Sequence, residues 1–379
     1  MKVHITLVGG QPAPVYNGIV ATEPDKVVYI YSDKTIEEAE RISNEVQIPS
    51  EKCKLDPVDL YDIEKKVTHC AEQYKDDEIS VNISSGTKPW AFYFAKIFGT
   101  MPNATLFYVD QNNMLWNLSD KSTKKVVFDM DAQFRLYGNP LGKYKLLTDY
   151  TDKDLKALEK IKNVRLFNTS DFNKLTATLN DKQQNILRNQ KSGKFDLMAI
   201  GSQSYVEWEK TNDDRIGFVR IFLAKKNGKG MEVSFESENA VDLTFNSGWF
   251  EFEVATLLSN CNKFQSIYLN CHFPFKPQAD KNEVDIIVNT GTKILFVECK
   301  TQISKPTDID KFRSVVKGYG GTGSKGIFIT EAKMSDIAKE KCSEHDLLTF
   351  SLNEDHLGLS NEKALALLLD SELFNINTK

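Results

Sequence analysis

The first third of the chain alternates short apolar runs with stretches of helical periodicity. Runs of this length predict strands, and apolar residues spaced along one side predict helices. In chain order we predict strands at Val3–Val8 and Val27–Tyr31, a helix over Thr35–Glu45, a strand at Ile79–Ile83, a helix over Trp90–Phe98 and a strand at Thr105–Asp110. Strands that alternate with helices form a parallel sheet whose loops meet at its carboxyl edge, so we expect a ligand site there.

This rhythm ends near Leu141, and residues 143–239 are predicted to connect two domains. The segment is rich in lysine and asparagine and contains a helical pattern over Asp154–Ile161. Near residues 216–235, two strand-like runs flank Asn227-Gly228, a dipeptide that favours a tight primed turn. We therefore expect a hairpin inside the connecting region.

A third pattern begins near Ala240. It predicts a helix over Gly248–Asn260, followed by strands at Ser266–Cys271, Val284–Asn289, Ile294–Cys299 and Gly326–Thr330. The expected fold class is α/β, with a Rossmann-like parallel-sheet domain over residues 1–142. A second α/β domain with a mixed sheet is expected over residues 240–379.

The composition limits the classes of protein to which this chain can belong. Its 379 residues, 41% of them hydrophobic, are enough to bury two separate cores. No apolar run reaches bilayer length and no basic leader precedes the first strand, so we expect a cytoplasmic protein with no membrane partner. The net charge of -5 disfavours a protein that coats nucleic acid, but it allows a local basic cleft. The six cysteines lack the paired spacing of a metal site and are expected to be reduced, and the five histidines are scattered.

Candidate chemistry lies on two predicted strands of the last domain. Side chains alternate faces along a strand, so Glu298 and Lys300 point the same way. If the strands form a hairpin around the four residues 290–293, Asp285 lies opposite Glu298 on that face, whereas a five-residue loop would separate them. The strands are apolar and look buried, where three charges are costly without a counterion. The alternative is an exposed charged face held by a cross-strand ion pair.

Directly opposed carboxylates repel each other unless a cation lies between them. Mg²⁺ or Mn²⁺ fits this role because hard divalent cations prefer oxygen ligands. The metal would polarise a scissile phosphate and lower the pKa of a bound water, while Lys300 orients that water or stabilises developing charge. Glu251, in the first turns of the preceding helix, is a further ligand or base; alternatively it is an acid favoured by the helix dipole.

The Glu251 helix, then Asp285, then Glu298-Cys299-Lys300 resemble the PD-(D/E)xK restriction-endonuclease-like superfamily. The resemblance implies a restriction-endonuclease-like domain in which Glu251, Asp285, Glu298 and Lys300 are catalytic. It also implies that Asp285, Glu298 and the backbone carbonyl of Cys299 bind the metal. Unlike the family pattern, no proline precedes Asp285.

Two loops of the first domain have the character of a ligand site. Gly9-Gly10-Gln11-Pro12 follows a strand, with glycines that let a ligand approach the backbone and a proline that stiffens the loop. The second loop, from Asn82 to Lys88, combines hydroxyls, free amides and a lysine at a helix N-terminus, which suits a phosphodiester or a ribose. Neither loop matches the dinucleotide or the triphosphate fingerprint. A plain strand-to-helix turn is the alternative for each loop.

Together these loops resemble the CRISPR-associated Rossmann fold (CARF) domain, over roughly residues 1 to 140. The resemblance implies that cyclic oligoadenylate binds to Gly9, Gly10, Gln11, Pro12, Asn82, Ser84, Ser85, Gly86, Thr87 and Lys88, with Asp110 and Gln111 at the end of a later strand as further candidates. A CARF domain joined to this nuclease type is similar to the CRISPR ancillary nucleases of type III antiviral systems, which are homodimers activated by cyclic tetra-adenylate. A ring of four identical nucleotides has a two-fold axis that matches an isologous dimer.

The sequence thus predicts an allosteric, metal-dependent endonuclease that cleaves DNA, RNA or both once cyclic tetra-adenylate binds. A rival hypothesis is a ligand-responsive regulator that binds nucleic acid without cutting it. A helix-turn-helix within residues 143–194 would favour this rival, but the one glycine of that segment, Gly193, lies at its far end. A third hypothesis, an ordinary nucleotide-cofactor enzyme, is disfavoured by the missing phosphate fingerprints.

Overall fold

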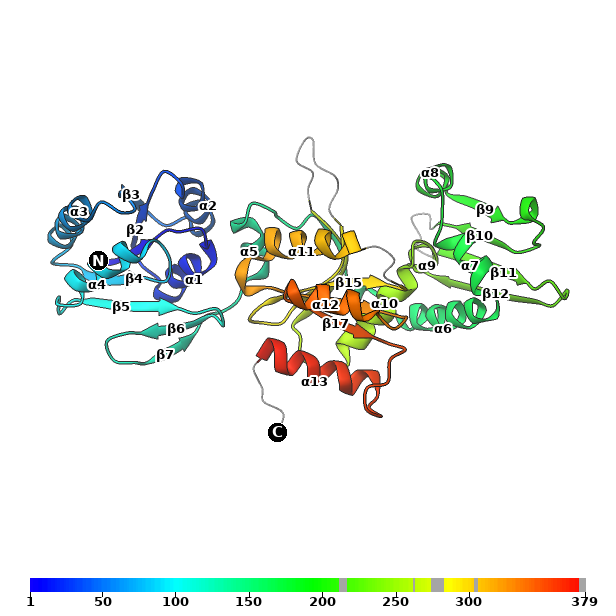
Figure 1. Ribbon diagram of the computed structural model, residues 1–379. Coiled ribbons are helices and arrows are strands. Elements are labelled where there is room, and N and C mark those ends of the chain that lie inside the picture. Colours follow the sequence, from blue (N-terminus) through cyan, green and yellow to red (C-terminus); the bar gives the residue numbers. More distant parts are fainter. Residues whose placement is uncertain (211–216, 262, 274–282, 303–305, 375–379) are drawn as a thin grey trace.

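The computed structural model describes residues 1–210, 217–261, 263–273, 283–302 and 306–374. Three lobes lie in a row (Figure 1): the N-terminal domain, a central domain built on the C-terminal sheet, and a smaller lobe formed by residues between them in the sequence. The central domain therefore lies next to both other units.

The N-terminal domain is a seven-stranded sheet of order β3-β2-β1-β4-β5-β6-β7. Strands β1 to β5 pair in parallel, and β6 and β7 continue the sheet as antiparallel strands. Its elements are β1 (Lys2–Leu7), α1 (Pro12–Thr22), β2 (Lys26–Tyr31), α2 (Ile36–Val46), β3 (Ser50–Lys54), α3 (Leu60–Gln73), β4 (Glu78–Asn82), α4 (Lys88–Phe98), β5 (Ala104–Val109), β6 (Met114–Asn117), β7 (Thr123–Lys125) and α5 (Met130–Leu136). The predicted Rossmann-like parallel sheet is confirmed.

Helices cover both faces of this sheet, which explains why its central strands are almost continuously apolar. Ile5 and Leu7 belong to one core with residues of α3 and α4, and Val27 and Tyr29 belong to a second core with residues of α1 and α2. The two cores lie on opposite faces, so the carboxyl ends of β1, β4 and β5 open at one edge between them.

The segment after β1 corrects one expectation about the first loop. Pro12 and Pro14 lie in the first turn of α1 rather than in a stiffened loop. Proline is tolerated in the first turn of a helix because the N–H groups there have no partner within the helix. The loop is therefore only Val8 to Gln11, and Pro12 is buried.

Residues 143–239 form more than a connection. After β8 (Lys143–Leu146) come α6 (Asp152–Phe167), α7 (Thr169–Thr176), α8 (Asp181–Asn189), β9 (Ser192–Asp196), β10 (Tyr205–Glu209), β11 (Gly217–Ala224) and β12 (Gly230–Ser237). The last four strands make an antiparallel sheet of order β12-β11-β10-β9. The sequence analysis did not predict this sheet, because many polar surface residues interrupt its apolar pattern.

The predicted hairpin is present as β11 and β12, but its turn differs from the expected one. The backbone N–H of Lys225 donates to the carbonyl of Lys229 at 2.8 Å, and that of Gly228 donates to the carbonyl of Lys225 at 3.0 Å. Gly228 has a φ of +79°, whereas Asn227 does not adopt a positive φ. Both primed two-residue turns need a positive φ at the first central residue, here Asn227, so this is a longer turn closed by a left-handed glycine.

The C-terminal sheet has the order β17-β16-β15-β14-β13-β8. Its antiparallel half contains β8, β13, β14 and β15, and its parallel half contains β15, β16 and β17, so the predicted mixed sheet is confirmed. The remaining elements are α9 (Ala240–Thr244), α10 (Gly248–Ser259), β13 (Ser266–His272), β14 (Glu283–Asn289), β15 (Ile294–Lys300), α11 (Pro306–Gly320), β16 (Lys325–Thr330), α12 (Asp336–Glu344), β17 (Leu347–Ser351) and α13 (Asn361–Phe374).

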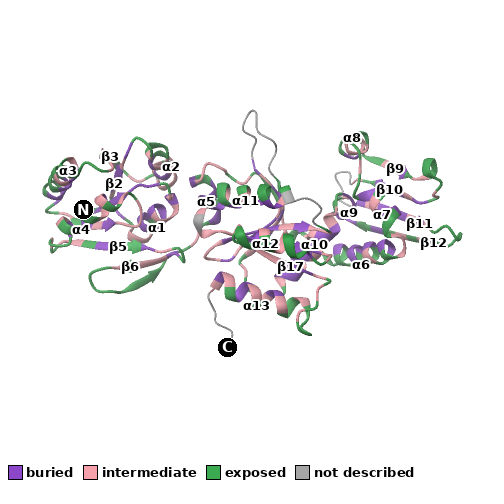
Figure 2. Ribbon diagram, in the orientation of Figure 1, coloured by how far each residue is buried: buried purple, intermediate pink, exposed green. Residues whose placement is uncertain are grey.

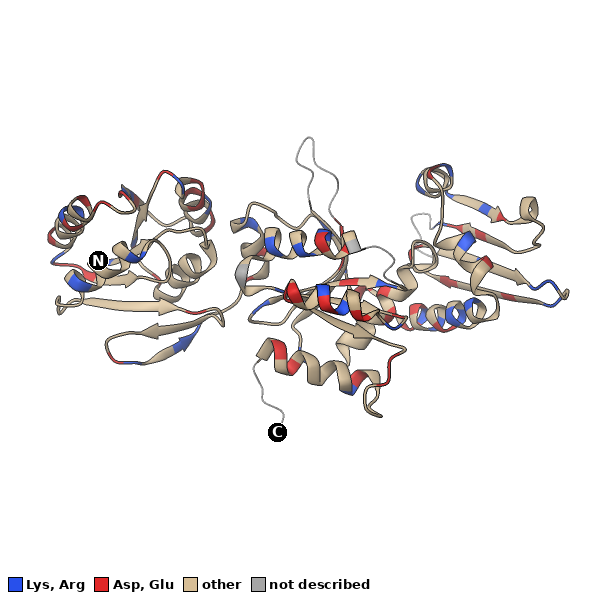
Figure 3. Cartoon of the chain, viewed as in Figure 1, with Lys and Arg blue, Asp and Glu red and all other residues tan. Residues whose placement is uncertain are grey.

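Buried residues and charged residues occupy different parts of the fold. Buried residues follow the sheets and the inner faces of the helices (Figure 2). Acidic and basic residues are mixed over the helices of all three lobes (Figure 3), in keeping with the small net charge of -5. Within the described ranges, no helix combines the length and the apolar character needed to cross a bilayer.

The smaller lobe and the central domain share one continuous core. Trp208 and Phe195 of the lobe belong to the same buried cluster as Ile286 and Leu295 of the C-terminal sheet. The Trp208 ring is 4.5 Å from that of Phe195 and 5.4 Å from that of Phe245, between centroids. The lobe is thus part of the central domain's fold.

We predict that Trp208→Ala lowers the free energy of unfolding by about 3–5 kcal/mol, the usual range for deleting a buried aromatic side chain. Because the core is shared, the lobe and the central domain should unfold in one transition. Chemical denaturation followed by circular dichroism measures both. A loss below about 1 kcal/mol, or a separate early transition of the lobe, contradicts the shared core.

Candidate active site and ligand-binding edge

The β14–β15 hairpin has the register that the site requires. Asn289 pairs with Ile294 and Ile286 pairs with Val297, so the turn consists of the four residues 290–293. The backbone N–H of Thr290 donates to the carbonyl of Lys293 at 3.1 Å, and Gly291 adopts a φ of +79°. This register puts Asp285 and Glu298 on the same face, as predicted from the alternation of the strands.

Three charged side chains meet where this ladder ends. The carboxylate of Asp285 accepts a hydrogen bond from the backbone N–H of Cys299 at 2.7 Å. The Lys300 ammonium lies 2.8 Å from Glu298 Oε1 and 3.9 Å from Asp285 Oδ2. The side chains of Asp285, Glu298 and Lys300 are 15%, 19% and 36% exposed, so the group lies in a half-buried position that water can reach.

Glu251 approaches the same group from α10, which packs against β13, β14 and β15. Its position follows from a tight helix start, because a Cβ on Gly248 would come within 2.0 Å of the Asp242 carbonyl oxygen. Burial, followed by the charge of Asp285, raises the pKa of Glu251 well above its usual range. The two carboxyls therefore lie close enough to sense each other.

The electrostatics of the site are dominated by carboxyls that are short of counterions. Burial and the neighbouring Glu298 raise the pKa of Asp285 to about 7. Burial alone would lower the pKa of Lys300, but the charges of Asp285 and Glu298 outweigh it and raise that pKa. The Lys300 ammonium thus lies among several carboxyls, an arrangement that favours a further cation.

The donor set fits a hard divalent cation. Carboxylate oxygens of Asp285 and Glu298 are the ligands that Mg²⁺ and Mn²⁺ prefer. The Cys299 side chain is buried in the core with Val297, on the face of β15 opposite to Glu298 and Lys300, so its backbone carbonyl is the candidate ligand. In the described part of the chain, no three His, Cys, Asp or Glu side chains converge as a metal cluster. A site here would therefore use two carboxylates, a carbonyl and water.

Glu283 is a residue of this neighbourhood that the sequence analysis missed. Its charge helps to raise the pKa of both Glu251 and Asp285, and its carboxylate lies 3.7 Å from Nε2 of His272. The alternation of β14 could have revealed it, because Glu283 and Asp285 share a face of that strand.

The two predicted ligand loops of the N-terminal domain touch at the carboxyl edge of its sheet. The backbone N–H of Gly9 donates to Ser85 Oγ at 3.1 Å, and Ser85 Oγ lies 3.5 Å from the carbonyl oxygen of Gln11. A Cβ on Gly9 would come within 2.6 Å of Ser85 Oγ, so glycine is needed for this approach. Gly86 has a φ of +78°, which also favours glycine.

Some of the predicted ligand residues instead hold the loops together. Asn82 is fully buried, donates to the carbonyl of Pro14 at 3.0 Å and accepts from the backbone N–H of Ser84 at 3.0 Å. Ser84 Oγ in turn accepts from the backbone N–H of Val109 at 2.7 Å. The carboxylate of Asp110 accepts three hydrogen bonds within the β5–β6 turn. The side chains of Asn82 and Asp110, like buried Pro12, are thus placed to position the loops.

The remaining ligand candidates are open to solvent at this edge. Gly10, Gly86, Lys88 and Gln111 are exposed, and Gln11, Ser85 and Thr87 are partly exposed. Thr87 caps α4 by accepting from the backbone N–H of Trp90 at 3.4 Å, and Lys88 is the first residue of that helix. A helix N-terminus with an adjacent ammonium attracts anions.

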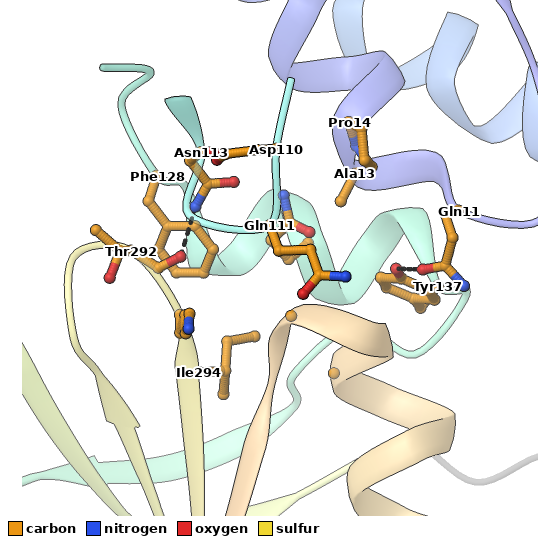
Figure 4. Close-up of a pocket in the computed structure, with 14 residues that line it drawn as sticks. Gln11, Ala13, Pro14, Asp110, Gln111, Asn113, Phe128, Tyr137, Thr292 and Ile294 are labelled. Atoms are coloured by element: carbon orange, nitrogen blue, oxygen red, sulfur yellow. Dashed lines mark hydrogen bonds between the residues drawn. The ribbon is translucent and has the colours of Figure 1, made fainter. Parts of the chain in front are cut away.

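A small cavity of about 50 Å³ lies between this edge and the C-terminal sheet. Figure 4 shows Gln11, Gln111 and Tyr137 on one side of it and Thr292 and Ile294 of the β14–β15 hairpin on the other. The ligand-binding edge and the hairpin that carries the charged group are therefore neighbours.

Comparison with known families assigns the N-terminal domain. Residues 3–136 match the family model of the Card1 CARF domain. The N-terminal domain is a CARF domain. No protein in a curated collection matches the chain in sequence.

Solved structures share the fold of nearly the whole chain. Can2 from Sulfobacillus thermosulfidooxidans, in complex with cyclic tetra-adenylate, is 17% identical, with a TM-score of 0.65 over 98% of this chain and 99% of that one. Protein VC1899 from Vibrio cholerae is 14% identical, with a TM-score of 0.67 and 98% coverage of both chains. A type III CRISPR defence DNA nuclease activated by cyclic oligoadenylate is 15% identical, with a TM-score of 0.58 over 96% of this chain and 51% of that one. The fold of nearly the whole chain, and not of the CARF domain alone, therefore also occurs in these proteins.

We predict that Asp285→Asn stabilises the metal-free protein at alkaline pH. The folded pKa of about 7 exceeds the ordinary value of 3.8, so ionising Asp285 destabilises the wild-type fold progressively as the pH rises through this interval. In EDTA, the melting temperatures of the two proteins should converge near pH 4 and separate by pH 8, with the variant higher. Mn²⁺ should raise the wild-type value and leave the variant nearly unchanged. Equal melting temperatures throughout would contradict the electrostatic account.

Proposed function

We propose that this protein is a metal-dependent endonuclease of type III CRISPR antiviral defence that cyclic tetra-adenylate switches on. The observation that carries the proposal is the meeting of Asp285, Glu298 and Lys300 at one half-buried strand edge. The CARF domain, the likeness to Can2 over both whole chains and the likeness to about half of a defence nuclease support it. The substrate is DNA, RNA or both.

The chain's own residues have distinct roles in this proposal. Asp285, Glu298 and the carbonyl of Cys299 would hold Mg²⁺ or Mn²⁺, which supplies Lewis acidity and a more acidic water. Lys300 keeps a positive charge beside Glu298 and can donate to a phosphate oxygen or to the attacking water. Glu251, whose pKa is raised by burial and by the charge of Asp285, would act as a further ligand or as a base.

We propose a homodimer that closes around the two-fold symmetric ligand. Exposed apolar residues lie beside the second ligand loop, where Thr87 Oγ1 donates to the carbonyl of Pro57 at 3.1 Å. Val58 is 71% exposed and Tyr61 is 89% exposed at the start of α3, and Phe92 is 61% exposed on neighbouring α4. A second copy that covers this patch would bring two copies of the Ser84–Lys88 loop to one ring.

A regulator that binds nucleic acid without cutting it is the second candidate, and one observation favours it. Helices α7 and α8 are separated by only residues 177–180, the spacing of a helix-turn-helix, although no glycine lies between them. Salt-sensitive duplex binding by a protein that cleaves nothing with any metal would select this candidate.

Cleavage by a Glu298→Ala variant tests the nuclease assignment. Labelled single strands and a supercoiled plasmid are incubated with Mg²⁺ or Mn²⁺, with and without cyclic tetra-adenylate. We expect at least a 100-fold loss of ligand-stimulated cleavage, because one of the metal's two carboxylate ligands is removed. Glu236→Ala, an exposed acid on β12, is the control and should cut like the wild type. Cleavage by the Glu298→Ala protein at the wild-type rate would reject the assignment.

Lys88→Ala tests the ligand site separately from the chemistry. Lys88 is exposed, has no ion-pair partner among the described residues and lies at the start of α4. Loss of a charge-assisted hydrogen bond should weaken cyclic tetra-adenylate binding about 10- to 100-fold. Isothermal titration calorimetry measures this change. Lys96→Ala, on the same helix and paired with Glu64, is the matched control and should bind normally. Unchanged affinity of the Lys88→Ala protein would remove Lys88 from the site.

A further inference from the structure

The CARF domain makes a direct hydrogen bond to the turn of the β14–β15 hairpin. Asn113 Nδ2 donates to the backbone carbonyl of Thr292 at 2.5 Å, across 179 positions of sequence. Thr292 lies in the four-residue turn, and the opposite end of the same two strands carries Asp285 and Glu298. A shift of Asn113 would therefore act on the hairpin that positions the charged group.

Asn113 is itself held by the helix that follows the first ligand loop. Its Oδ1 accepts from Asn17 Nδ2 of α1 at 2.8 Å, and the two residues are only 8% and 1% exposed. Its φ of +58° is fixed within the β5–β6 turn, where its backbone N–H donates to the carbonyl of Asp110 at 3.1 Å. A buried amide pair of this kind is costly to break, so Asn17 and Asn113 move as one unit.

Helix α1 is tied equally closely to the second ligand loop. Asn82, which begins that loop, donates to the carbonyl of Pro14 in the first turn of α1. A Cβ on Gly18 would come within 2.3 Å of Asn82 Nδ2, so helix and loop are in contact without space between them. A continuous series of buried contacts thus runs from the ligand loop through α1 and Asn113 to Thr292.

A second contact joins the first ligand loop to the other side of the central domain. The Tyr137 hydroxyl donates to Gln11 Oε1 at 3.0 Å. The same hydroxyl packs closely against Gly321, which lies in the turn after α11. A Cβ on Gly321 would be only 2.1 Å from this hydroxyl. Asn139 Nδ2 adds a hydrogen bond to the carbonyl of Gly318 at 3.0 Å. Helix α11 packs against β15 and β16, so this contact also reaches the strand of Glu298 and Lys300.

The cavity between these contacts leaves room for the interface to rearrange. It is lined by Gln11, Asn113, Tyr137 and Thr292 (Figure 4). Gln133 also lines it, is 4% exposed, and has no partner for Nε2 among the described residues. A buried donor without a partner is unfavourable, so an arrangement that satisfies it is available as an alternative state.

We propose that Asn113 and Tyr137 are positioning residues that transmit ligand binding from the CARF domain to the nuclease site. The inference rests on the proposed function and adds the route by which ligand binding affects the nuclease site. Asn113 acts on the turn of the β14–β15 hairpin, and Tyr137 acts on α11, so ligand binding reaches two supports of the metal-binding strands. Neither residue is among the predicted ligand or metal residues. Each changes the equilibrium between an idle and an active hairpin, which is what coupling between two sites requires.

Two conservative variants separate coupling from a structural role. Asn113→Ala removes the bridge to Thr292, and Tyr137→Phe removes only one hydroxyl. We expect both proteins to bind cyclic tetra-adenylate within about threefold of the wild-type affinity and to keep its unstimulated cleavage with Mn²⁺. The stimulation by ligand should fall at least tenfold in Asn113→Ala and about fivefold in Tyr137→Phe, because coupling energies of one hydrogen bond are of this size. Calorimetry and cleavage rates with and without ligand measure these quantities.

The controls are neighbours that lack these contacts. Asn112→Ala changes an exposed amide next to Asn113, and Tyr108→Phe changes a 40% exposed tyrosine of β5; both should be stimulated like the wild type. Wild-type stimulation of the Asn113→Ala and Tyr137→Phe proteins overturns the inference, as does an equal loss of stimulated and unstimulated cleavage. If a thermal melt shows that the Asn113→Ala protein is not folded, the stimulation of the Tyr137→Phe protein alone decides whether the inference holds. A wild-type protein that neither binds the ligand nor cleaves rejects the proposed function itself, a different result from intact stimulation of the variants.

Discussion

The repulsion among carboxyls at the ends of β14 and β15 is the constraint on which the rest of this structure depends. Asp285, Glu298 and Glu251 share a half-buried edge with the Lys300 ammonium, and burial, followed by the charge of a neighbouring carboxyl, raises the pKa of Glu251 and of Asp285. A fold selected for stability alone would place apolar side chains there. Like charges at this edge are unfavourable, and the divalent cation that we propose would relieve their repulsion.

The arrangement of the lobes brings the strands of this site into contact with the CARF domain. The carboxyl edge of the CARF sheet faces the central domain, and the turn of the β14–β15 hairpin lies against it. In the coupling that we propose, a displacement at residues 290–293 would be carried along the hairpin to Asp285 and Glu298 at its other end. On the other flank, the smaller lobe shares a core with the same sheet. Strands β14 and β15 therefore lie between the CARF domain and the smaller lobe.

The sequence predicted features that depend on local periodicity. The alternation of β14 and β15 and the length of their turn were sufficient to place Asp285, Glu298 and Lys300 together, and the strand-helix rhythm was sufficient for the parallel sheet. Features that depend on tertiary contacts were missed. The internal role of Asn82 follows from its burial against α1, and the fold of the smaller lobe follows from a core whose residues, such as Trp208, are spread among polar neighbours. No sequence motif marks Asn113, because it matters through one hydrogen bond to Thr292, a residue 179 positions away.

Locating the metal tests the central claim most directly. Crystals grown with Mn²⁺, measured at wavelengths on either side of the manganese absorption edge, reveal the ion through its anomalous scattering. The account predicts a peak about 2.1 Å from carboxylate oxygens of both Asp285 and Glu298, with the carbonyl of Cys299 as a third ligand and waters completing the shell. Manganese bound elsewhere, with this strand edge empty and its carboxyls paired only to Lys300, would contradict it.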